Sequence, residues 1–136
     1  MAKTVDTEFQ IPLIESAVPA GFPSIAEDYV DRALNVQELL IKHPAATFFV
    51  RVKGTSMINA GIQSNDILIV DRALTPIDNK IVVARIDGEL TVKRLRIDAN
   101  NKVLLVAESA DYAPIEITSS MDFEIWGVVT FVIHQA

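Results

Sequence analysis

The dipeptide Asp87-Gly88 limits the fold of this chain more than any other feature. It stands between two runs rich in β-branched and apolar residues, 80–86 and 89–97. Asp-Gly suits a two-residue turn whose central residues both take positive φ, so the two runs are predicted to form an antiparallel hairpin. Further strands are predicted over residues 47–53, 67–71, 103–107 and 125–133. The chain is therefore expected to be mainly β.

Two capping boxes predict two short helices ahead of these strands. In each box, a residue that caps a helix N-terminus is followed three positions later by a glutamate: Ser24 with Glu27, and Asn35 with Glu38. The predicted helices cover residues 24–34 and 36–42, and Pro44 ends the second. With 136 residues, the chain is long enough for one hydrophobic core, so residues 24–136 are interpreted as one domain.

Residues 1–23 are predicted to be a flexible N-terminal arm. Three prolines interrupt any long helix or strand ladder there: Pro12, Pro19 and Pro23. Residues 16–22 (Ser-Ala-Val-Pro-Ala-Gly-Phe) are uncharged and mostly small. This composition favours an extended, exposed path that another part of the protein can approach closely.

Composition and charge exclude several classes of protein. The absence of cysteine excludes disulfides, thiolate zinc sites and a cysteine nucleophile. The net charge of −6 argues against affinity that rests on phosphate neutralisation, so direct sequence-specific DNA binding is not expected. No apolar run reaches the roughly 18 residues that span a bilayer, and residues 1–10 lack a secretory signal. We therefore expect a cytoplasmic protein without a membrane partner.

Few residues are available for catalysis. His43 and His134 stand near a helix end and near the C-terminus, and neither position suggests a catalytic triad. No metal-ligand spacing or phosphate-binding loop is present, so neither a metal nor a cofactor is expected. Ser56 remains, directly after the strand predicted over 47–53. A serine there is most often a turn residue, but Gly54 allows a sharp turn that would present Ser56 beside free N–H groups.

Lys93 is the second candidate catalytic residue. In the strand predicted over 89–97, the period of two places it on the more apolar face, with Leu95 and Ile97. A lysine on a strand is usually a surface residue whose amine reaches water. A lysine base, however, needs apolar surroundings, because keeping it neutral at pH 7 against a free pKa of about 10.4 costs roughly 4–5 kcal/mol. Ser56 and Lys93 together would make a Ser–Lys dyad.

The sequence around both residues resembles the LexA/UmuD family of self-cleaving proteins. The serine-box region of that family is similar to residues 52–57 (Val-Lys-Gly-Thr-Ser-Met), 61–62 and 66–71. Its lysine box is similar to residues 90–95 (Leu-Thr-Val-Lys-Arg-Leu), and the cleavage site of its UmuD branch to residues 20–24 (Ala-Gly-Phe-Pro-Ser). One departure is Asn65, where the family commonly has glycine; asparagine also tolerates a left-handed turn.

The resemblance implies a role for each matching residue. Ser56 would be the nucleophile, Lys93 the general base and Ala20–Gly21 the scissile bond, with Gly54 and Met57 supporting the turn and the oxyanion site. The implied fold is a LexA/UmuD-like β domain that forms a homodimer. Residues 125–133 would make a long apolar strand, and as a bare sheet edge it would need a partner, so a homodimer through this region is expected.

The short segment before Gly21 is similar to the UmuD branch rather than to LexA repressors, which place a DNA-binding domain there. The resemblance implies an SOS-response protein whose self-cleavage is stimulated by a RecA–single-stranded-DNA filament. The shortened dimer would then act with a Y-family polymerase subunit in translesion synthesis. Two alternatives remain: a signal-peptidase-like serine–lysine protease, and a non-cleaving interaction module of the same fold. Incubation of the pure protein at alkaline pH separates them, because only self-cleavage gives one clean cut.

Overall fold

The computed structural model describes residues 11–14 and 30–136, and it divides the chain into two compact units, residues 1–42 and 43–136. In the first unit, β1 (Ile11–Ile14) pairs antiparallel with β2 (Val30–Leu34), and α1 (Val36–Leu40) follows. None of the helices in these ranges is both long and apolar enough to cross a bilayer. The predicted boundary after residue 23 falls among residues that are not described and stays a prediction.

The N-terminal helices differ from the prediction. Residues 30–34, expected to end a helix, form β2 instead, and residues 24–29 lie outside the described part of the chain. Pairing with β1 supplies backbone hydrogen bonds that local helix propensity cannot outweigh. The second helix is present but ends at Leu40, since Ile41 is already extended at φ −124°. Its predicted cap is present: the Asn35 side chain accepts a 3.1 Å hydrogen bond from the Glu38 N–H.

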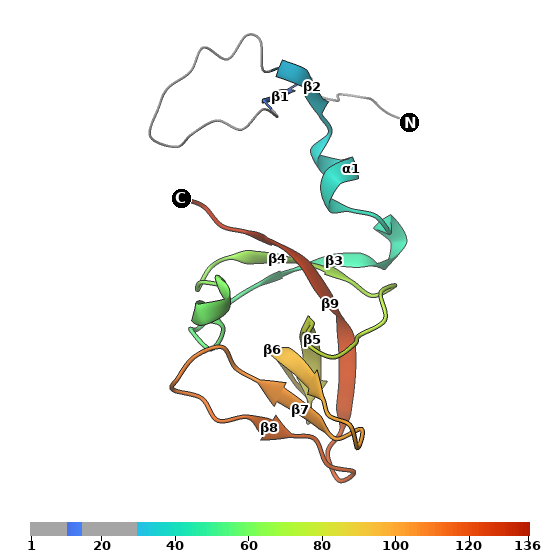
Figure 1. The fold of residues 1–136 in the computed structure, drawn as a ribbon, viewed down its shortest axis with the longest axis vertical. Coiled ribbons are helices and arrows are strands. Elements are labelled where there is room, and N and C mark those ends of the chain that lie inside the picture. Colours follow the sequence, from blue (N-terminus) through green and yellow to red (C-terminus); the bar gives the residue numbers. More distant parts are fainter. Residues whose placement is uncertain (1–10, 15–29) are drawn as a thin grey trace. The chain divides into compact units, whose positions relative to one another are not determined.

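The second unit is built on one seven-stranded antiparallel sheet (Figure 1). In spatial order the strands are β3 (Thr47–Arg51), β4 (Ile67–Asp71), β9 (Phe123–Ile133), β5 (Ile81–Ile86), β6 (Glu89–Ile97), β7 (Val103–Val106) and β8 (Ile115–Glu116). Short 3-10 helices, Pro44–Ala46 and Ile58–Ala60, precede β3 and β4. The expectation of a mainly β fold is confirmed.

The β5–β6 hairpin has the predicted turn. Asp87 and Gly88 take φ values of 50° and 90°, so both lie in the left-handed region that a two-residue turn requires. The turn fixes the register, which pairs Ile86 with Glu89 and Val82 with Lys93. A turn of another length would have shifted Lys93 to another position along β5 or to the other face of the sheet.

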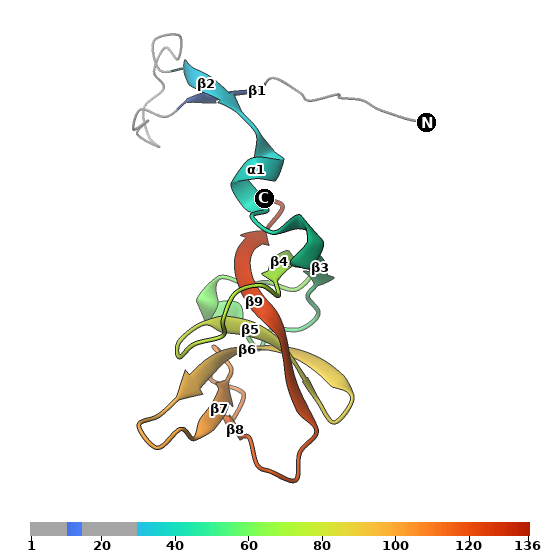
Figure 2. The same ribbon diagram turned by 90° about the vertical axis from the view of Figure 1, so that its right-hand side faces the viewer.

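Contrary to the expectation from the sequence, the long strand β9 is not a bare sheet edge. Its first half pairs with β5 and its second half with β4, so it joins two parts of the sheet (Figure 2). β9 comes very close to β4 at Gly127, where a Cβ atom would lie 2.7 Å from Val70 Cγ1. Only glycine fits such an approach without displacing its neighbour. An apolar run predicts a strand but not which neighbours it finds.

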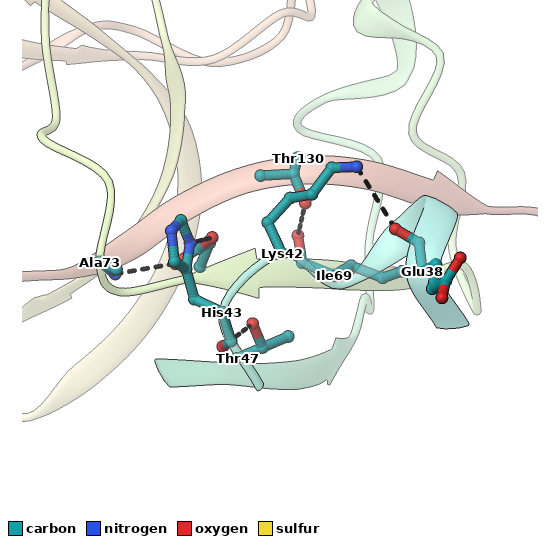
Figure 3. Close-up of polar contacts among 8 residues, drawn as sticks. Glu38, Lys42, His43, Thr47, Ile69, Ala73 and Thr130 are labelled. Atoms are coloured by element: carbon teal, nitrogen blue, oxygen red, sulfur yellow. Dashed lines mark hydrogen bonds and ion pairs between the residues drawn. The ribbon is translucent and has the colours of Figure 1, made fainter. Parts of the chain in front are cut away.

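Two buried aspartates bracket β4, and each accepts a hydrogen bond from a histidine. His43 Nδ1 lies 2.6 Å from Asp71 Oδ2, and His134 Nδ1 lies 2.7 Å from Asp66 Oδ1. Burial raises the pKa of Asp71, but the bonds from His43 and from the Ala73 N–H (Figure 3) outweigh it and lower that pKa overall. The backbone N–H of Gln63, followed by His134, lowers the pKa of Asp66. Both histidines therefore have structural partners.

Candidate active site

Ser56 lies in the turn that leads from β3 to the 3-10 helix Ile58–Ala60. Gly54 takes φ +97°, which allows the chain to turn sharply after β3, as predicted. Met57 is almost fully buried in the core beside Ile62 and Leu68, and this anchors the turn next to Ser56. Ser56 itself is only half-buried, so its hydroxyl is held at the surface of the core.

The turn also leaves main-chain donors available. Within the described part of the chain, no protein acceptor is recorded for the amide N–H groups of Thr55, Ser56 and Met57. Free N–H groups beside a nucleophile can stabilise the oxyanion of a tetrahedral intermediate. The turn is thus able to supply an oxyanion site, and the role predicted for Gly54 and Met57 stays a prediction.

Lys93 lies on β6 with its side chain buried, at 8% exposure. Leu95, on the same face, is 1% exposed, so the sequence correctly identified the more buried face of this strand. The Lys93 amine lies 3.2 Å from Ser56 Oγ, 2.6 Å from Thr91 Oγ1 and 3.2 Å from the Val92 carbonyl oxygen. The structure therefore brings the two predicted catalytic residues together.

Burial lowers the pKa of the Lys93 amine below its ordinary value of 10.5, because the charged form loses its hydration. When charged, the amine donates one proton to each of its three oxygen neighbours. When neutral, it keeps two N–H groups for Thr91 and Val92 and offers its lone pair to the Ser56 hydroxyl. The same contacts thus serve both protonation states, and the neutral state is that of a general base.

A cleft of about 430 Å³ opens at this pair. One wall comes from β3 and the Ser56 turn, the other from residues 90–93 of β6, and Tyr112 lies at its border. The Leu95 main chain bonds toward β5, through Lys80 and Asn79, so the alternate residues Leu90 and Val92 direct their main-chain groups away from β5. Since β7 pairs only with residues 94–97, no described strand covers this edge of β6 beside residues 90–92, and an extended chain could pair with it.

The remaining predictions from the sequence have different outcomes in the structure. Asn65 takes φ 79°, the left-handed conformation expected where the family commonly has glycine. Ala20 and Gly21 lie outside the described residues, so the predicted cleavage site remains a prediction. Alternation along β6 predicts that Thr91 shares a face with Lys93, where side chains two positions apart are within reach, but it does not predict the hydrogen bond to the amine. No sequence signal pointed to Tyr112 at the border of the cleft.

A serine hydroxyl beside a buried lysine amine, in a cleft on a β sheet, is the arrangement that a serine peptidase with a lysine base requires. The family model described as Peptidase S24-like matches residues 12–130. The chain belongs to this family, whose members are in general self-cleaving serine peptidases.

The similar proteins indicate the branch. Protein ImpA of Salmonella typhimurium is 42% identical over 130 residues, which cover 96% of this chain and 88% of that protein. Protein MucA of Escherichia coli is 42% identical over 88% of this chain and 82% of its own length. A LexA repressor of Shewanella sp. is 39% identical over 96% of this chain but only 63% of the repressor. The resemblance to the UmuD branch of the LexA/UmuD family is confirmed, and with it an SOS mutagenesis family.

Proposed function

We propose that this protein cuts its own chain between Ala20 and Gly21, with Ser56 as nucleophile and Lys93 as general base. The observation that carries the proposal is the 3.2 Å contact between Lys93 Nζ and Ser56 Oγ, made by a buried amine whose pKa is lowered. A buried amine of this kind can accept the proton of a serine, which ordinary surface lysines cannot do at neutral pH.

The steps follow from these positions. Neutral Lys93 takes the hydroxyl proton while Ser56 Oγ attacks the Ala20 carbonyl carbon, and N–H groups of the turn receive the oxyanion. The bond to Gly21 then breaks, and Lys93 gives its proton to the departing amine. Water, deprotonated by Lys93, hydrolyses the acyl-enzyme, which releases the Ala20 carboxylate and restores Ser56.

The cleft supports an extended substrate segment. The main-chain groups of Leu90 and the N–H of Val92 can pair with residues that precede the scissile bond, as in the addition of a strand to a sheet edge; the Val92 carbonyl oxygen already accepts from the Lys93 amine. Ala20 has a side chain small enough to lie close to Ser56, and Gly21 leaves the carbonyl open to attack. Uncharged residues 16–20 suit a cleft that must keep Lys93 free of water.

Mass spectrometry of the pure protein after alkaline incubation tests this proposal. We expect two products, residues 1–20 and 21–136, with no protease added. Gly21→Glu should abolish the cut, because a bulky charged side chain would stand beside the nucleophile in a desolvated cleft. Gln10→Glu adds the same charge elsewhere in the arm and should cut normally. Cleavage at another bond would contradict the site, and an intact chain would favour a non-cleaving interaction module.

The family suggests the setting of this reaction. We propose that a RecA–single-stranded-DNA filament stimulates the cut and that the shortened protein acts in the cytoplasm with a Y-family polymerase subunit. Translesion synthesis during the SOS response would then depend on removal of the arm. What supports this is the similarity to ImpA and MucA over most of both chains.

The homodimer is also a proposal, and an apolar row with two exposed aromatic residues supports it. Phe49 of β3 and Phe131 of β9 lie on either side of Ile69 of β4, which is itself fully buried. Phe49 is 60% and Phe131 39% exposed. Contact of these aromatic side chains with water is unfavourable unless a partner covers them. We expect sedimentation to show a dimer at micromolar concentration, weakened by Phe131→Asp but not by Leu74→Asp, which lies outside the row. A monomeric wild type would contradict this expectation.

A further inference from the structure

Glu108, which follows β7, binds the Ser56 turn through its main chain. Its N–H donates a 2.8 Å hydrogen bond to the Ser56 carbonyl oxygen, and its own carbonyl accepts one of 2.8 Å from the Asn59 N–H. The two bonds hold both ends of the segment 56–59, which carries the nucleophile. The position of the Ser56 hydroxyl therefore depends on where Glu108 lies.

The Glu108 side chain is tied to the strand of the base. Arg94 Nη2 donates a 3.2 Å hydrogen bond to Glu108 Oε1, while Arg94 Nη1 donates one of 2.8 Å to the Asn79 carbonyl oxygen. Arg94 directly follows Lys93 on β6, so it lies on the opposite face of the strand. The side chains of Arg94 and Glu108 are only 23% and 31% exposed, so solvent screens the pair less than an open surface pair.

A continuous path of contacts thus links nucleophile and base outside the cleft. It runs from Ser56 through the Glu108 main chain and carboxylate to Arg94, and then to Lys93 as the next residue. We propose that the Arg94–Glu108 pair is a positioning device that sets the distance between Ser56 Oγ and the Lys93 amine. The proposal rests on the proposed function, because only the cleavage reaction requires Ser56 Oγ and the Lys93 amine to be held at a set distance.

The geometry of the dyad explains why such a device matters. Proton transfer needs the two heavy atoms within about 3.2 Å, and they already stand at 3.2 Å in this structure. Movement of the turn by about 1 Å would break the contact, and misplacement of that size can lower a rate by about a hundredfold. Lys93 keeps its contacts to Thr91 and Val92 whatever the turn does. Loss of the pair should therefore change the rate and not the titration of the base.

Glu108→Gln is the variant that tests the device, because it keeps the shape of the side chain and removes its charge. Arg96→Gln is the matched control: Arg96 also lies on β6 and pairs with Asp78, but both side chains are about half exposed. We expect Glu108→Gln to lower the plateau of the pH–rate profile about tenfold with an unchanged midpoint, and Arg96→Gln to change neither. The exchange of charges in Arg94→Glu with Glu108→Arg should recover part of the loss. A wild-type plateau in Glu108→Gln would overturn the proposal.

Amide hydrogen exchange decides the same question without cleavage. In a Ser56→Ala background, Glu108→Gln should speed exchange of the Glu108 and Asn59 N–H groups at least about tenfold, while the N–H groups of β4 keep their protection. Unchanged exchange at both amides overturns the proposal. A wild-type protein that never cuts itself would instead refute the proposed function, and the exchange result would still show whether the pair anchors the turn.

Discussion

Ser56→Ala and Lys93→Ala are each expected to reduce self-cleavage by at least about a thousandfold, because the two residues act as one unit. Without the hydroxyl no acyl-enzyme forms, and without the amine the hydroxyl keeps its proton. The structure shows Ser56 Oγ within hydrogen-bond distance of no other titratable side chain in the described residues. Among residues 11–14 and 30–136, no second base is therefore in place to substitute for Lys93.

The protein should stay folded in both variants. Ser56 is half-buried in a turn that the Met57 side chain anchors, so loss of one hydroxyl leaves the core intact. Lys93→Ala removes a buried amine whose desolvation already opposes folding, which offsets part of the cost of the cavity.

Exposed residues of the same types serve as controls for the dyad. Lys102→Ala removes an exposed lysine that pairs with Glu116, and Ser120→Ala removes an exposed hydroxyl. Both should cleave at the wild-type rate. Cleavage rates come from gel densitometry, and circular dichroism reports the fold. The double variant Ser56→Ala, Lys93→Ala should be no slower than either single one. A Lys93→Ala protein that cuts normally at neutral pH would exclude the lysine-base mechanism.

The sequence made Ser56 and Lys93 candidates because each stands in a local pattern, and the resemblance to the LexA/UmuD family then gave each its expected role. Asp87-Gly88 fixes the register of β5 and β6, and alternation along β6 then determines which side chains are buried. Lys93 interrupts the more apolar face of β6, although a lysine at such a position is usually a surface residue. Gly54 marks the turn that presents Ser56. None of these inferences needs knowledge of distant parts of the chain.

Pairing between segments that are far apart in the sequence could not be predicted, because no local pattern identifies the partner of a strand. The segment 30–34 follows a capping box, yet it pairs with residues 11–14, and nothing local announces that partner. The run 125–133 reads as a strand, but its place between β4 and β5 depends on Gly127, where the Val70 side chain comes close. Glu108 looks like an ordinary loop residue, and only the fold brings it to Ser56 and Arg94.

In the proposed mechanism, the charge state of Lys93 makes the cleavage rate depend on pH. Because burial lowers its pKa in the folded protein, the neutral fraction grows as pH rises and is complete above that lowered pKa. Below that pKa, each rise of one pH unit multiplies the neutral fraction of Lys93, and hence the cleavage rate, by about ten. A segment seated in the cleft would exclude water and lower the pKa further. An activator that favours the seated segment would therefore lower the pH at which the same cut occurs, with Ser56 still required.

We expect the cleavage rate to rise about tenfold per pH unit until the lowered pKa of Lys93 is reached, and to level off below pH 10.5, the ordinary lysine value. Thr91→Val should move the midpoint to lower pH, because it removes the 2.6 Å acceptor that stabilises the charged amine. A shift of one unit would raise the rate at pH 7 by about tenfold. Thr130→Val is the matched control, since Thr130 bonds the Ile69 carbonyl oxygen and not the amine. A midpoint near 10.5 in the wild type, or one that Thr91→Val leaves in place, would show that the buried amine does not limit the reaction.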